Sequence, residues 1–143
     1  MFKLSNYFTL EELLFSKTAA RYGIDNFPGR DIIGTLISTA EKMDKIRDLL
    51  GHPILVSSGY RSPELNKKVG SSPSSQHTKG QAVDFICPRF GTPRKIVEAI
   101  IKSGIEFDQL ILEFDSWVHI SFIDSDSRNQ ALIIDKQGTR PFK

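Results

Sequence analysis

Hydrophobic residues change their spacing along this sequence, and that change limits what the chain can fold into. From about 31 to 50 they recur three and four positions apart, which predicts one long helix. Along Gln109–Phe114 and Trp117–Ile123 they alternate with other residues, which is typical of half-buried strands. The length of 143 residues fits one ordinary domain. We therefore expect an α+β fold over residues 1–143, in which helices pack against a small antiparallel sheet.

Cap and breaker residues predict the remaining elements. Thr9 followed by Glu12 fits a capping box and predicts a short helix to about Lys17. Ser62-Pro63 and Thr92-Pro93 each combine an N-cap with a proline at the first helical position. These two signals predict helices from 63 to about 69 and from 93 to about 103. Strands are expected at 54–56 and 81–87, with a weak one at 131–134.

The charge balance and the cysteine count exclude several classes of protein. Nineteen basic and 17 acidic residues leave a net charge of +2, which gives no basic footprint for nucleic acid. No apolar stretch approaches the ~20 residues that span a bilayer, so we expect no membrane insertion. The first 15 residues contain two glutamates where a signal peptide needs an apolar centre, so we expect synthesis in the cytoplasm without an export signal. The single Cys87, expected in the core, excludes an internal disulfide and any cysteine-based zinc cluster.

Alternation in the last two strong strands predicts which side chains share a face. The apolar residues of both strands must lie on the core face, namely Leu110, Leu112 and Phe114 with Val118, Ile120 and Phe122. Cross-strand partners point to the same side of a sheet, so we expect Phe114 to pair with Val118 through a three-residue loop. This register places Glu113 directly opposite His119, on the face away from the core.

Asp84 is expected on the same face. It alternates with the apolar Val83 and Phe85 in the strand at 81–87, and His77 lies seven residues earlier, in the loop that enters this strand. Two imidazoles and one carboxylate, with water in the fourth position, make a catalytic zinc site. A nearby carboxylate outside the metal shell is then available as a general base.

Ten residues of this region match a known pattern. Ser75–Asp84 reads SQHTKGQAVD and fits S-x-H-x-x-G-x-A-x-D at every fixed position. Ser58–Ser62 (SGYRS) and Trp117–Ser121 (WVHIS) resemble two further segments of the same family. The chain thus resembles the zinc D-Ala-D-Ala carboxypeptidases and L-alanyl-D-glutamate endopeptidases, which belong to a larger group with lysostaphin-type enzymes and the hedgehog signalling domain. The resemblance covers roughly residues 3 to 123, and the chain looks most like the short, single-domain phage members.

This resemblance implies roles for the matching residues. The zinc ligands of the family correspond to His77, Asp84 and His119. Glu113 matches the general base of hedgehog-like members, which stands six residues before the last ligand. Other members carry their acidic residue three before that ligand, where this chain has Ser116. Asp115 is one residue away from that place and stays open as an alternative base.

Three further residues are candidates for contact with the substrate. Arg61 matches the family arginine in the cleft, where its fork of donors suits a carboxylate or the scissile carbonyl; a surface salt bridge is the alternative. Ser75 either contacts a ligand or the substrate, or only hydrogen-bonds within its own loop. Trp117 stands where some relatives carry a second histidine, and it either lines the cleft rim or packs at the strand end.

The resemblance implies a Zn²⁺-dependent metallopeptidase that hydrolyses peptide bonds in the stem peptides or cross-links of bacterial peptidoglycan. Carboxypeptidase and endopeptidase activities both stay open, as do roles in phage lysis, virion entry and wall remodelling. The alternative is a zinc-stabilised module without catalysis, for binding or for the structure of a virion, although such a module has no need of Glu113 as a base. We expect a monomer that acts on the cell wall after release or as part of a phage particle.

Overall fold

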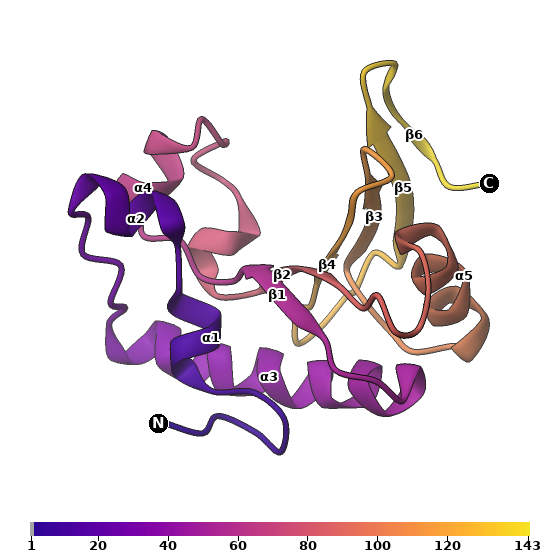
Figure 1. Cartoon of the computed structure of the whole chain (residues 1–143), viewed down its shortest axis with the longest axis horizontal. Helices are drawn as coiled ribbons and strands as arrows, with labels where there is room; N and C mark the ends of the chain where they lie inside the picture. The colour runs from indigo at the N-terminus through magenta and orange to yellow at the C-terminus, as the bar shows by residue number, and fades with distance from the viewer. Residues whose placement is uncertain (1) are drawn as a thin grey trace.

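Cap and turn residues divide the chain into helices and strands much as the sequence predicts. The computed structural model describes residues 2–143 (Figure 1). Its helices are α1 (Leu10–Leu14), α2 (Lys17–Tyr22), α3 (Arg30–Leu50), α4 (Pro63–Lys68), the 3₁₀ turn η1 (Gln76–Lys79) and α5 (Pro93–Ser103). Its strands are β1 (Leu55–Ser58), β2 (Ala82–Ile86), β3 (Gln109–Glu113), β4 (Trp117–Ser121), β5 (Gln130–Asp135) and β6 (Gly138–Pro141).

The N-terminal capping box is confirmed, but the helix that it starts is shorter than expected. The Thr9 side chain accepts from the Glu12 amide, and the Glu12 side chain accepts from the Thr9 amide. The expected helix to Lys17 is wrong, because Phe15 is extended and Ser16 caps a second helix by accepting from the Ala19 amide. Ser16 is thus the start signal of α2, which the sequence interpretation did not include.

The long helix α3 supplies one wall of the core, as its spacing predicts. It ends at Gly51, which adopts a left-handed conformation with φ +68°. Figure 1 shows α3 running beneath the strands, with α5 beside the far end of the sheet. Its buried residues pack in one core with the apolar faces of α5 and the sheet, namely Leu36, Ala40, Met43, Ile46 and Leu50. None of the helices within residues 2–143 has the length and apolar character to cross a membrane.

The sheet has six strands in the order β1-β2-β4-β3-β5-β6. All neighbouring strands are antiparallel except β3 and β5, which run parallel, so the expected all-antiparallel sheet needs this one correction. The weak strand expected at 131–134 is β5, and β6 was not predicted. The α+β class is confirmed, with helices against a mostly antiparallel sheet. One face of the central strands is the core, and the opposite face carries Asp84 and His119 as direct cross-strand partners.

Gly59, directly after β1, lies against the end of α1. A Cβ atom at this position would lie 2.4 Å from the Leu13 carbonyl oxygen and 2.9 Å from its Cα. The next amide, that of Tyr60, donates to the same Leu13 oxygen at 2.8 Å. The absence of a side chain at Gly59 therefore allows the β1 end and α1 to touch through their backbones.

We expect Gly59→Ala to lower the free energy of unfolding by about 1–3 kcal/mol, because the added methyl group meets fixed backbone atoms. Gly34→Ala is the matched control, since nothing lies within 4 Å of a Cβ at Gly34. In the interior of α3 that change should instead raise stability, by about 0.5–1 kcal/mol. Urea unfolding followed by circular dichroism measures both. Equal effects of the two substitutions would contradict the close approach of Gly59 to α1.

Candidate metal centre

His77 is held by the short η1 turn and by the loop after β1. Ser75 caps η1 by accepting from the His77 amide at 3.2 Å, and Gly80 ends the turn with φ +74°. The His77 side chain is buried, and its Nδ1 lies 2.7 Å from the Gly59 carbonyl oxygen. Since a carbonyl oxygen only accepts, Nδ1 carries the ring proton and Nε2 keeps its lone pair.

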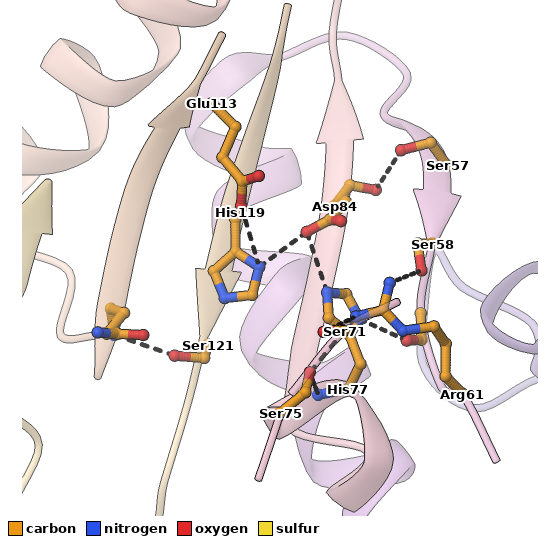
Figure 2. Close-up of polar contacts among 12 residues, drawn as sticks. Ser57, Ser58, Arg61, Ser71, Ser75, His77, Asp84, Glu113, His119 and Ser121 are labelled. Atoms are coloured by element: carbon orange, nitrogen blue, oxygen red, sulfur yellow. Dashed lines mark hydrogen bonds and ion pairs between the residues drawn. The ribbon is translucent and has the colours of Figure 1, made fainter. Parts of the chain in front are cut away.

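Asp84 on β2 brings the two histidines together. Its Oδ1 lies 3.2 Å from His77 Nε2 and 2.8 Å from His119 Nδ1 (Figure 2). The β2–β4 register pairs Asp84 directly with His119, so their side chains leave the sheet on the same side. Burial alone would raise the pKa of Asp84, but its contacts with the His119 and His77 rings hold that pKa well below its usual range. The carboxylate therefore stays charged.

The contact between His77 and Asp84 requires a positive charge. With Nδ1 protonated toward Gly59, a neutral His77 would point the lone pair of Nε2 at a carboxylate oxygen 3.2 Å away. A metal ion bound between these atoms would supply that charge and remove the repulsion. One ligand atom from each of His77, Asp84 and His119 lies within 4.8 Å of the other two. Nitrogen and carboxylate ligands of this kind are those that zinc takes in proteins, so the residues present fit a zinc ion.

Glu113 lies beside this cluster at the end of β3. Its Oε1 is 3.9 Å from His119 Nδ1, and the side chain is half-buried. Burial raises the pKa of Glu113, and the negative charge of Asp84 raises it further, while His119 and Arg61 act in the opposite direction. A carboxylate with a raised pKa next to the three ligand atoms is suited to take up a proton.

The structure corrects the expected register of the β3–β4 hairpin. Glu113 pairs with Trp117 and Ile111 pairs with His119, so the predicted pairs of Phe114 with Val118 and of Glu113 with His119 are wrong. Phe114 and Asp115 have φ of +54° and +52°, which ends β3 at Glu113 and starts the loop one residue early. Phe114 is consequently 46% exposed rather than part of the core.

The predicted face of Glu113 nevertheless remains correct. The observed and expected registers differ by two residues, and side chains alternate with a period of two, so the same residues share each face. Glu113 reaches His119 diagonally across the hairpin rather than directly. Asp115, the alternative base, lies exposed in the loop.

Arg61 lies on the other side of the cluster, held by neutral partners. Its Nε donates to Asn66 Oδ1 at 3.1 Å, and its terminal nitrogens donate at 3.4–3.5 Å to the hydroxyls of Ser58, Ser71 and Ser75. Burial lowers the pKa of Arg61, whereas the charges of Asp84 and Glu113 raise it. No carboxylate of residues 2–143 forms an ion pair with it, so a surface salt bridge is not what holds this side chain.

Ser75 and Trp117 are the remaining residues expected to contact the substrate. Ser75 accepts from both the His77 amide and Arg61, and so it links these two residues. Trp117 is the cross-strand partner of Glu113 and packs against Phe114, with ring centroids 5.7 Å apart. Its buried Nε1 has no hydrogen-bond partner among the described residues. Trp117 therefore packs at the start of β4, beside Glu113.

The sequence interpretation did not include two supporting groups. Buried Asn66 accepts from Arg61 and donates to the Ser72 carbonyl at 2.8 Å. Its position as a polar residue next to Leu65 in α4 is the only sequence signal that could have indicated this role. Asp108 anchors η1 by accepting from Gln76 at 3.0 Å, and it also accepts from the backbone and side chain of Arg128. Asp108 joins segments far apart in the sequence, and no local pattern indicates such a contact.

We expect Asp108→Asn to destabilise the protein at neutral pH and to lose that effect in acid. Hydrogen bonds from Arg128 lower the pKa of Asp108 to about 2. An unfolded aspartate titrates at about 3.9, so the stabilisation is complete above about pH 4 and is lost as the pH falls through about 2. Urea unfolding of both proteins between pH 7 and pH 2 measures this change.

Asp124→Asn is the control, since its exposed carboxylate only meets Lys42 at 3.3 Å. It should leave the pH dependence of stability unchanged. A constant difference between wild type and Asp108→Asn across the pH range would show that the Asp108 charge does not stabilise the fold.

A family of known proteins matches most of the chain. The Peptidase M15 family matches residues 6–121, a region that includes the His77–Asp84–His119 cluster, Glu113 and Arg61. The search of curated proteins found no match. The matched region ends with β4, so β5 and β6 lie beyond it.

Proposed function

Because the chain belongs to the M15 peptidase family, we propose that it is a zinc-dependent peptidase that hydrolyses peptide bonds of bacterial peptidoglycan. One observation carries the proposal: His77 and His119 converge on a single oxygen of Asp84, with the carboxylate of Glu113 3.9 Å from His119. A module that only binds zinc needs the first part of this arrangement. A protonatable carboxylate beside it serves catalysis and is not needed to bind zinc alone.

His77, Asp84 and His119 would hold the zinc ion, whose Lewis acidity polarises the scissile carbonyl and activates water at neutral pH. Glu113 accepts a proton from the attacking water and delivers it to the leaving amine. Its raised pKa supports the first of these steps, because a more basic carboxylate takes a proton more readily. The half-buried position of Glu113 strengthens its interaction with the charges that develop.

Arg61, Ser75 and Trp117 would position the substrate. The guanidinium of Arg61 is oriented by three serine hydroxyls and Asn66, and it donates to a carboxylate or carbonyl oxygen of the peptide. Ser75 accepts hydrogen bonds from both Arg61 and the His77 amide, and Trp117 would contact the substrate next to Glu113. The place of action would be the cell wall, since the proposed substrate lies there.

The direct test is mass spectrometry of purified peptidoglycan fragments incubated with the protein. We expect new peptide termini that are absent when a chelator is present and that return when zinc is restored. The masses identify the bond and so distinguish a carboxypeptidase from an endopeptidase. Intact fragments with zinc-loaded, folded protein would exclude the proposed substrate.

We expect the purified protein to hold about one zinc ion per chain and His119→Ala to lose it. Ligands must be deprotonated to bind metal, so zinc affinity should fall as the solution is acidified. Elemental analysis after equilibration with zinc at pH 7.5 and pH 5 measures both effects. His52→Ala is the matched control, because His52 lies outside the cluster. Equal zinc content in the two variants would contradict the assignment of His119.

We expect Glu113→Gln to retain zinc and the fold but to lose about 10²–10⁴-fold in kcat, the range for removing general acid–base catalysis. Glutamine keeps the shape of the side chain but cannot accept the proton. Asp115→Asn, in the exposed loop of the same hairpin, should cost less than about tenfold. Steady-state rates at saturating substrate compare the two variants, and the reverse ranking would assign the base to Asp115.

A further inference from the structure

A trough beside Arg61 is lined by basic and apolar side chains. It consists of two adjoining hollows of about 470 and 600 Å³, lined by residues 15–18, β1, α2, Arg61 and the end of α4. The hollows share Lys17, Thr18 and Val69, so they form one continuous surface. Each hollow has a volume in the range of sites for small ligands.

The trough concentrates positive charge. Its lining contains Lys17, Arg21, Arg61 and Lys68, and it contains no aspartate or glutamate. Within residues 2–143 none of these four cations forms an ion pair with a carboxylate. The whole chain carries a net charge of only +2, so this surface is far more positive than the average. An anionic occupant complements it.

Lys68 and Arg61 are held in place without being neutralised. The Lys68 ammonium lies 4.1 Å from the centroid of the Tyr22 ring, which orients the charge but leaves its three donors available. The partners of Arg61 are hydroxyls and an amide, which are likewise uncharged. Both cations therefore remain able to pair with an added anion.

Two residues of the trough lie beside the candidate metal centre. They are Arg61, which donates to Ser75 of the turn that holds His77, and Ser58, the cross-strand partner of Asp84. Figure 2 shows Arg61 reaching from the β1 side toward His77 and Asp84. Its wall includes β1, which lies at the edge of the sheet and offers backbone groups to an extended chain. Exposed Phe15 and Val69 add apolar surface for the aliphatic parts of such a chain.

We infer that this trough binds the carboxylate-bearing part of an extended acidic peptide, at positions away from the scissile bond. The inference rests on the proposed function and specifies it. The preferred substrate carries free carboxylates that lie on the Arg61 side of the metal centre. Where remote contacts act equally on ground state and transition state, their loss raises KM and leaves kcat unchanged, and this is the result we expect for the trough.

The test uses two preparations of peptidoglycan fragments that differ only in whether the carboxylates of the peptide are free or amidated. Zinc-loaded wild-type protein should cleave the free form with at least a tenfold higher kcat/KM, and salt should reduce this preference. The triple variant K17Q/R21Q/K68Q should lose the preference through a higher KM for the free form. Its kcat/KM for the amidated form should equal that of wild type.

The control variant K95Q/K102Q/K136Q removes the same charge from exposed lysines outside the trough, and it should keep the preference. Equal kcat/KM for the two forms in wild type, or an unchanged preference in the trough variant, would overturn the inference.

If the protein cleaves neither form, the proposed function is overturned. Binding in the trough is then tested by the dissociation constants of the two forms, measured by calorimetry. Tighter binding of the free form by wild type and control, but not by the trough variant, supports the inference. Equal dissociation constants for the two forms overturn it.

Discussion

The hydrogen bond between the His77 ring and the Gly59 carbonyl is the contact on which the rest of the site depends. It selects the ring tautomer and so leaves the lone pair of His77 Nε2 available to a metal ion beside Asp84. The carbonyl is itself immobile, because Gly59 lies against the α1 backbone and the next amide bonds to Leu13. The Arg61 amide donates to the His77 carbonyl at 3.1 Å, so a second hydrogen bond joins the loop after β1 to η1. Three segments far apart in sequence are thereby joined at one imidazole.

Features with a local physical cause could be predicted from the sequence. The Thr9 capping box, the ends of α3 and α5 at glycine, and the Ser62 cap all depend on residues within one helical turn. The shared face of Asp84 and His119 follows from the period of two along each strand. The cluster with His77 also followed from the ten-residue pattern, which holds turn, glycine and strand in one continuous segment.

Features that depend on tertiary contacts could not be predicted from the sequence. The hairpin register hinges on left-handed Phe114, a conformation that sequence patterns disfavour for a bulky residue and that leaves its side chain exposed. The parallel pairing of β3 with β5 joins strands that are not sequence neighbours, and the Asp108–Gln76 hydrogen bond spans 32 positions. Single-sequence periodicity carries no information about such partners, so the supporting contacts of η1 appear only in the folded chain.

The parallel β5 strand has a consequence for how the molecule behaves at high concentration. By pairing along β3 it turns the strand that bears Glu113 into an interior strand, and the open edges of the described sheet become β1 and β6. β6 ends at Pro141, which has no amide hydrogen to offer, and β1 has only four residues. A four-residue edge can take a short peptide, but an edge that is short or ends at proline is a poor template for the long ladders of self-association and fibril growth.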